Sequence, residues 1–178
     1  MEIKLETQKI IAESEGLGWL WEFLEKYGPY WTAPASARKE YHGCEPGGLA
    51  RHSFAVLKEM LHNSSCPKTD CTVVALLHDI GKAGDEEGLY FVPEPSNWHR
   101  EKLGQFYKHN EDIRNMPHAT RSIWICMRWG LKLTKAQFHA IMYHDGMYAH
   151  SRDDLRGLWP LTLLLHSADM WTSQIEKI

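Results

Sequence analysis

Apolar residues recur along this chain at helical spacing, in segments that glycine and proline separate. In the clearest case, residues 17–27 place their apolar side chains on one face of a helix, which Gly28 and Pro29 end. Thr134 is a good N-cap for a later helix. The same reasoning predicts further helices over residues 49–62, 67–80, 99–108, 117–129, 134–143 and 161–176.

Alternation of apolar and polar residues, the pattern of a strand, is nearly absent. Residues 88–92 are the one candidate strand. They lie within residues 83–97, where glycine, proline and glutamate predict a loop over the surface. The pattern as a whole therefore predicts an all-α fold.

Length and composition narrow the class of protein further. The chain has 178 residues, which fits one domain, and its hydrophobic fraction of 43% is that of a globular protein. The net charge is −3, so a nucleic-acid substrate would need a local basic patch. No signal peptide or membrane-spanning stretch is evident, and the four cysteines contain no C-x-x-C pair. We expect a cytoplasmic protein without disulfides or a membrane partner.

Candidate chemistry begins with His78 and Asp79, which stand side by side at the end of an apolar segment. A charged Asp in such a segment is costly without a partner. A divalent cation would serve, because imidazole nitrogen and carboxylate oxygen are both good ligands. On its own, the doublet also fits a surface pair that closes a helix, with Lys82 as its salt-bridge partner.

Other histidines and one aspartate favour a metal site over a surface pair. The chain has 11 histidines, and histidine is the commonest metal ligand among side chains. His52, His118, His144 and Asp169 each lie on a different predicted helix or helix end, mostly within apolar sequence. Convergence of such side chains inside a bundle is how helical proteins build dinuclear sites.

Several segments resemble motifs of the HD superfamily of metal-dependent phosphohydrolases, which is named for its His-Asp doublet. Together they extend over roughly residues 41–172, most of the chain. The segment MPH at 116–118 has proline where the family usually has glycine. In chain order, the segments are PGGLARHS at 46–53, HDIGK at 78–82, MPH at 116–118, YHDG at 143–146 and HSAD at 166–169.

This resemblance implies an HD-type helical bundle with a buried metal site. It implies one domain over residues 1–178, with the motif-bearing core at about 41–172 and a helical extension, 1–40, packed on it. It also implies two divalent ions bridged by Asp79, because minimal HD nucleotidases lack the two histidines of the second site. The implied metal ligands are His52, His78, Asp79 and Asp169 for the first site, and His118 and His144 for the second.

The function that the resemblance implies is hydrolysis of a phosphoester in a nucleotide or short oligonucleotide, through a metal-activated water. The six-ligand branch includes phosphodiesterases and 3′–5′ exoribonucleases. The H-H-E and G-Y-P signature of cyclic-dinucleotide phosphodiesterases is absent here. The ligand set suits Mn, Fe, Co, Ni or Zn better than Mg.

Two cations are candidates for contact with the substrate phosphate. Lys82 lies one helical turn past His78, and Arg121 lies one turn past His118. We assign Asp79 and Lys82 to catalysis, and Lys82 and Arg121 to substrate binding. The alternatives are that Lys82 compensates a helix C-terminus and that Arg121 forms a surface salt bridge.

Two other functions stay open at this point. The same ligand set resembles that of the di-iron HD oxygenases, so the metal could be iron with a redox role. The second open function is that of a non-catalytic nucleotide-binding regulatory domain. Among the remaining histidines, His166 is a candidate to support a ligand, whereas His42, His62, His99, His109, His139 and His150 are expected to be exposed or hydrogen-bonded.

Overall fold

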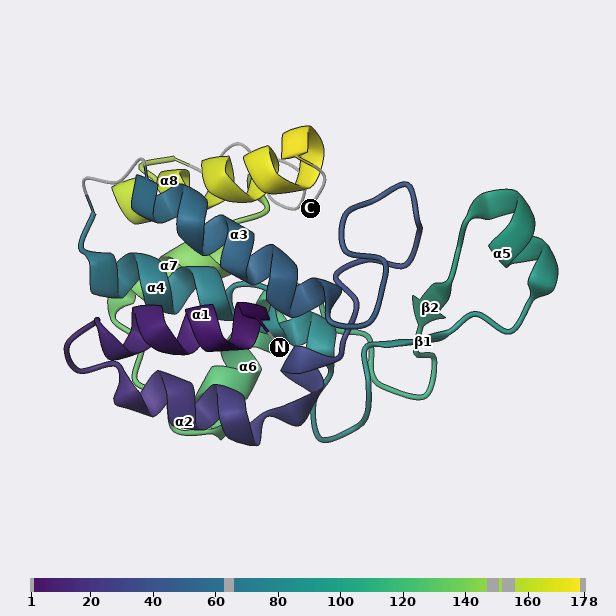
Figure 1. Ribbon diagram of the computed structural model, residues 1–178, viewed down its shortest axis with the longest axis horizontal. Coiled ribbons are helices and arrows are strands. Elements are labelled where there is room, and N and C mark those ends of the chain that lie inside the picture. The colour runs from purple at the N-terminus through teal and green to yellow at the C-terminus, as the bar shows by residue number, and fades with distance from the viewer. Residues whose placement is uncertain (1, 63–65, 147–150, 152–155, 177–178) are drawn as a thin grey trace.

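The structure, a computed structural model, describes residues 2–62, 66–146, 151 and 156–176. Helices dominate the described chain, accompanied by one two-stranded sheet (Figure 1), which confirms a mostly helical fold. The α-helices are α1 Glu2–Ala12, α2 Gly18–Lys26, α3 Gly48–His62, α4 Lys68–Leu77, α5 Asn97–Leu103, α6 His118–Arg128, α7 Lys135–Tyr143 and α8 Pro160–Met170. The short helices are η1 Gly28–Trp31, η2 Ile80–Ala83 and the π-helical η4 Trp171–Glu176.

Helix α4 lies at the centre of the body. Every residue from 71 to 80 is buried, as expected of a helix that is apolar on all sides. Helix α3 packs on α4 and α8, and α7 packs on α4, α6 and α8 (Figure 1). Apolar side chains of α1 and α2, among them Ile11 and Leu20, belong to the same buried core as those of α3 and α4.

The helix predicted over 67–80 ends earlier than expected. The α-helix stops at Leu77, and a short 3-10 helix, η2, begins at Ile80. Ser122 of α6 satisfies the backbone groups freed at this break. Its hydroxyl donates to the carbonyl of His78 at 2.7 Å and accepts from the backbone N–H of Gly81 at 2.9 Å. The break turns Asp79 out of the helix, next to the start of α6.

The prediction of one helix over residues 99–108 is wrong. Helix α5 ends at Gly104, which adopts the left-handed conformation that favours glycine at a helix C-terminus. The chain then forms strand β2, Tyr107–His109, which pairs antiparallel with β1, Phe91–Pro93. The candidate strand at 88–92 therefore exists but begins later, and its partner was missed.

We call residues 91–109 the arm, because β1, α5 and β2 project together from the helical body (Figure 1). The arm is attached through the loop that precedes α3. The backbone N–H of Lys39 donates to the carbonyl of Gly104, and that of Phe106 donates to the carbonyl of Ala37. This loop and the arm are thus hydrogen-bonded to each other and lie together beside the helical body.

The start of α7 agrees with the sequence signals, and the end of α8 does so in part. Thr134 caps α7 in a full capping box with Gln137. The last predicted helix, over 161–176, is α-helical only to Met170 and continues as the π-helical η4. Each boundary matters here, because the candidate ligands lie at or near helix ends.

Two further expectations from the sequence concern membrane-spanning helices and disulfide bonds. No helix in the described ranges combines the length and apolar character that crossing a bilayer requires. All four cysteines lie in the described part of the chain, and none of them forms a disulfide bond.

Candidate metal centre

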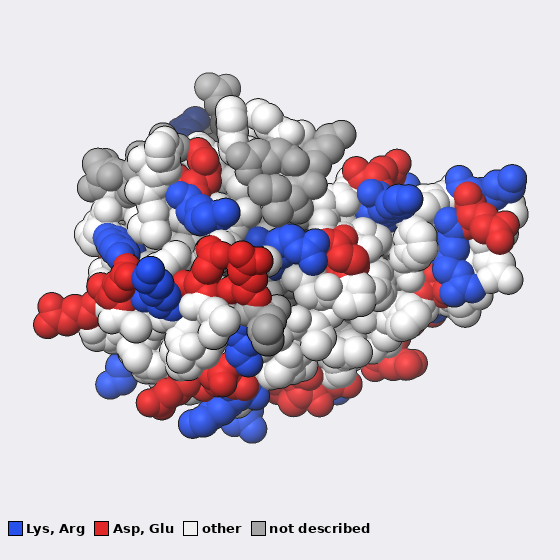
Figure 2. Space-filling view, in the orientation of Figure 1, with Lys and Arg blue, Asp and Glu red and all other residues white. Residues whose placement is uncertain are grey.

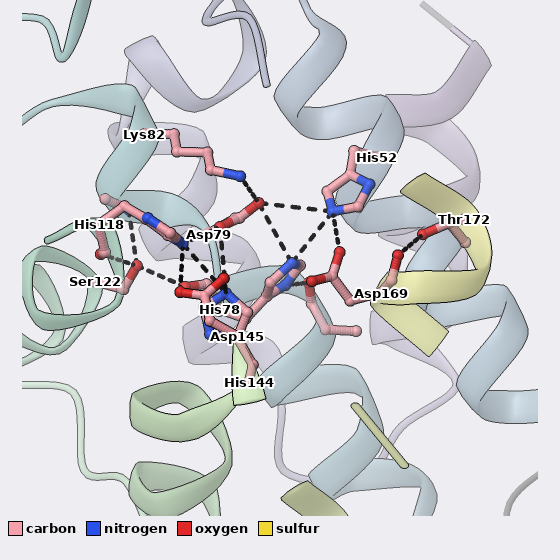
Figure 3. A network of polar contacts seen from close by, with 12 residues as sticks. His52, His78, Asp79, Lys82, His118, Ser122, His144, Asp145, Asp169 and Thr172 are labelled. Atoms are coloured by element: carbon pink, nitrogen blue, oxygen red, sulfur yellow. Dashed lines mark hydrogen bonds and ion pairs between the residues drawn. The ribbon is translucent and has the colours of Figure 1, made fainter. Parts of the chain in front are cut away.

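The structure brings the six predicted ligands together in one cluster (Figure 3). Apart from the adjacent His78 and Asp79, each comes from a different helix or helix end. His52 lies one turn into α3, and His78 and Asp79 lie at the break between α4 and η2. His118 is the first residue of α6, His144 follows the last residue of α7, and Asp169 lies in the last turn of α8.

Asp79 stands at the centre of the cluster, with its side chain 1% exposed. Its Oδ2 atom lies 3.6 Å from Nε2 of His52 and 3.5 Å from Nε2 of His78. Its Oδ1 atom lies 3.3 Å from Nε2 of His118 and 3.6 Å from Nε2 of His144. The two oxygens of one carboxylate therefore face two different pairs of histidines.

Asp169 completes the first of these two sets. Its Oδ1 atom lies 3.0 Å from Nε2 of His52, whose Nε2 in turn lies 3.3 Å from Nε2 of His78. By donor spacing, the sets that could hold an ion are His52, His78 and Asp169; His78, Asp79 and His144; and His118, His144 and Asp145.

Two ring nitrogens have their protonation fixed by the backbone. Nδ1 of His78 lies 2.9 Å from the carbonyl oxygen of Ala75, and Nδ1 of His144 lies 2.7 Å from that of Ile141. A carbonyl oxygen can only accept, so each Nδ1 carries a hydrogen. In the neutral ring, Nε2 then offers a lone pair to the cluster, which is the arrangement of a metal-ligating histidine.

The Nε2 atoms of the cluster histidines lie close to one another. Nε2 of His118 lies 3.4 Å from Nε2 of His144, and the Oδ1 atom of Asp79 is buried without a hydrogen-bond partner. A buried, charged oxygen without a partner is costly, and a cation between these donors would satisfy all of them. The donor set of nitrogen and carboxylate oxygen fits a divalent transition metal.

Electrostatics keep the central carboxylate charged. Burial would raise the pKa of Asp79, but the nearby Lys82 and His78 hold it well below its usual range. Burial lowers the pKa of His78 to about 4. Burial would also lower the pKa of His144, yet the nearby carboxylates of Asp79 and Asp145 raise it to about 9.

Lys82 reaches the cluster as predicted, although its partner is a ligand candidate. Its Nζ atom lies 2.6 Å from Oδ2 of Asp79, and its side chain is 16% exposed. Burial would lower the pKa of Lys82, but Asp79 and Asp169 raise it, so the ammonium group persists. Contact with a substrate phosphate stays a prediction for this residue.

Arg121 lies one turn past His118, as its spacing predicted, but its side chain is held in an ion pair of its own. It is 1% exposed, so it is not a surface residue. Its guanidinium pairs with Asp85 and donates to the carbonyl of Arg114 at 2.7 Å. Contact with a substrate would require breaking this buried ion pair, which is costly. The geometry gives no support to the substrate-binding role predicted for Arg121.

Three residues that sequence reasoning did not promote as ligands lie at the cluster. Asp145 has its Oδ2 atom 3.1 Å from Nε2 of His118. His166 contacts the carbonyl oxygen of His144 through Nδ1 at 2.6 Å, which fits the supporting role considered for it. The ring of His42 lies 4.4 Å from that of His52, and its Nε2 is buried without a hydrogen-bond partner.

A signal for Asp145 was present in the sequence. His144 and Asp145 repeat the His-Asp doublet of residues 78 and 79, again directly after a helix. No comparable signal marks His42, because it lies in a loop without helical periodicity. His150 lies outside the described residues.

Gly81 permits the close approach that brings His118 to Asp79. A methyl group on Gly81 would overlap the carbonyl oxygen of His118 and press on the backbone nitrogen of Ser122. The start of α6 therefore packs directly against the backbone of η2. Any larger residue at this position would push His118 away from the cluster.

We predict that Gly81→Ala lowers the free energy of unfolding by about 1–3 kcal/mol, because it overpacks a buried contact. Urea denaturation of the metal-free protein measures this change. Gly18→Ala is the matched control, because a methyl group there meets no neighbouring atom within 4 Å. Equal stability of the two variants would contradict the assigned role of Gly81.

Comparisons with known proteins add no relative. No family model, no curated protein and no solved structure matches this chain. The motifs and the geometry of the cluster are therefore the grounds for assigning a function.

Proposed function

We propose that this chain is a metal-dependent phosphohydrolase of the HD superfamily that binds two divalent ions. The observation that carries the proposal is the position of Asp79, whose two carboxylate oxygens face His52 and His78 on one side and His118 and His144 on the other. A carboxylate shared in this way is the natural bridge of a dinuclear centre. The HD-type order of the ligands along the chain supports the same assignment.

The residues divide into two ligand sets around that bridge. His52, His78 and Asp169 would hold one ion together with Asp79, and His118 and His144 would hold the other. Asp145 adds a carboxylate to the second set, since its Oδ2 atom lies next to His118. Bound divalent ions lower the pKa of water and offset negative charge on phosphoryl oxygens.

The protein's own groups would orient the phosphoester at this centre. A cavity of about 200 Å³ opens beside the cluster, lined in part by His42, Lys82, Asp145, His166 and Asp169. Its size suits a phosphoryl group rather than a whole nucleotide. Lys82 stands in its wall with a charged ammonium group, so we assign Lys82 to hold a phosphoryl oxygen.

The first test is the metal content of protein purified without chelator or added metal. We expect two ions per chain by elemental mass spectrometry, not predominantly iron. The same protein should hydrolyse bis(p-nitrophenyl) phosphate and lose that activity when EDTA removes the ions. Two iron ions with oxygen consumption would favour the oxygenase instead, and no binding of Mn, Co, Ni or Zn after reconstitution would contradict the proposal.

A further inference from the structure

A second, larger cavity adjoins the first and runs under the arm. It measures about 530 Å³ and lies between the loop that precedes α3, the arm and η2. His42, Lys82 and Gln174 line both cavities, so the two share a boundary at the cluster. We call this larger cavity the arm cleft. Its volume is within the range of sites that hold small molecules, and it is large enough for a nucleoside.

The arm cleft is basic, although the protein as a whole is not. Its lining includes Arg38, Lys82 and Lys108, whereas no Asp or Glu lines it among the described residues. On the face shown in Figure 2, by contrast, acidic and basic side chains are interspersed. The net charge of −3 means that a nucleic-acid ligand needs a local basic patch, and this cleft is one.

Two of these cations are available to a ligand. Arg38 and Lys108 each have one carboxylate partner in the structure, Glu40 and Glu111, both at 3.4 Å. Those glutamates are 58% and 82% exposed, and exposed ion pairs of this kind contribute little. Lys82 differs, because Asp79 already offsets its charge at 2.6 Å. Arg38 and Lys108 therefore form an anion-attracting pair away from the metal centre.

The cleft also offers flat aromatic surfaces. Tyr41 lines it and is 55% exposed, so its ring is open to a partner. Phe91 and His109 face each other across the β1–β2 pair, with ring centroids 5.1 Å apart, and both line the cleft. Aromatic rings next to cations are the usual means of holding an unpaired base together with its phosphate.

His42 stands where the two cavities meet. Its Nε2 atom is buried without a hydrogen-bond partner in the structure. A buried polar atom is normally satisfied, so one that is not points to a missing partner. A phosphate or sugar oxygen that spans the boundary would supply it.

We infer that the arm cleft holds the non-reacting part of the substrate, a nucleotide unit with a phosphate of its own. This inference rests on the proposed function, because the scissile phosphoryl group lies in the smaller cavity. Arg38 and Lys108 bind the second phosphate, Tyr41 stacks on the base, and His42 contacts the linking segment. The substrate thus carries at least two phosphates, as a short oligonucleotide or a nucleoside polyphosphate does, and is not a nucleoside monophosphate.

Binding in EDTA tests the cleft without hydrolysis. The probes are pApA, ADP, AMP and adenosine, titrated calorimetrically into the full chain. We expect pApA or ADP to bind at least tenfold more tightly than adenosine. Arg38→Gln combined with Lys108→Gln should lower that affinity at least tenfold, and Tyr41→Ala should lower the affinity for pApA. Lys9→Gln combined with Lys132→Gln removes the same charge from exposed positions outside the cleft and should change nothing.

The comparison of probes separates the two sources of the second phosphate. Tighter binding of pApA than of ADP identifies an oligonucleotide site, and the reverse identifies a nucleoside polyphosphate. Unchanged pApA and ADP affinity in the Arg38 and Lys108 double variant, with its helical circular dichroism intact, would overturn the inference. If metal-loaded wild type fails to hydrolyse phosphoesters while cleft binding persists, the inference survives as a binding site and the proposed function fails.

Discussion

Asp79→Asn is expected to abolish both metal binding and phosphoester hydrolysis. The substitution keeps the size of the side chain but removes the charge that both sets of histidines face. An amide also cannot offer two anionic oxygens to two cations. Metal content should fall to that of an EDTA-treated sample, and hydrolysis of bis(p-nitrophenyl) phosphate should fall below detection.

Thermal unfolding gives an independent measure of the same loss. An ion at 100 times its Kd stabilises the folded protein by about 2.7 kcal/mol. In a chain of this size, that corresponds to a rise in Tm of about 5–10 °C. We expect this rise in the wild type and in Asp112→Asn, whose side chain is exposed, but not in Asp79→Asn. A metal-dependent rise in Asp79→Asn would show that Asp79 is not the bridge.

The position of Asp79 was partly predictable from sequence. Its place after an apolar run required a partner, and the HD-type motifs named the other candidate ligands. What the sequence could not reveal is which oxygen faces which histidine, because that depends on the break after Leu77. The break is stabilised from a distance by Ser122, whose bonds to His78 and Gly81 link residues more than forty positions apart.

The arm shows where helical periodicity fails. Apolar spacing continues past Gly104, so a helix through residue 108 was a reasonable expectation. The glycine instead ends α5, and the following residues pair with β1. The backbone groups of 106 and 107 also pair with Ala37, a contact across about seventy residues. Such long-range pairings leave no local sequence pattern, so the arm cleft could not be predicted from the sequence.

Arg121 illustrates a different limit. Its spacing from His118 correctly placed it one turn further along α6, but spacing does not say which way a side chain points. Here the guanidinium turns to Asp85, and the ring of Tyr90 lies 5.8 Å from it. A buried guanidinium needs a carboxylate partner, because an unpaired buried charge is strongly destabilising. Asp85 lies in the segment that had been predicted only as a surface loop.

The two ligand sets differ in exposure, and this makes them separable by mutation. His52 is completely buried, whereas the side chains of His118 and Asp145 are 21% and 24% exposed. In the first set only Asp169 reaches solvent, at 19%, whereas in the second set only His144 is enclosed, at 1%, so the second set lies closer to solvent. An ion in the second set should exchange faster with chelators and be the easier one to remove.

We therefore predict that His118→Ala combined with His144→Ala reduces the metal content from two ions per chain to one. These side chains face only the Oδ1 side of Asp79, so His52, His78 and Asp169 keep their donors for the first ion. Hydrolysis should be lost, because one ion cannot clamp both the attacking and the leaving oxygen. Elemental mass spectrometry counts the remaining ions.

The control removes two histidines that face no candidate ligand set. His62→Ala combined with His99→Ala should keep both ions and full activity, since neither residue belongs to the cluster. The reciprocal variant, His52→Ala combined with Asp169→Asn, should lose the ion of the first set. If both site variants keep two ions, the histidines are not ligands; if both lose all metal, the centre is a single cooperative unit and not two separable sites. Loss of one ion in each variant is the result expected of two separable sites, and the Asp79→Asn variant then tests whether Asp79 is shared between them.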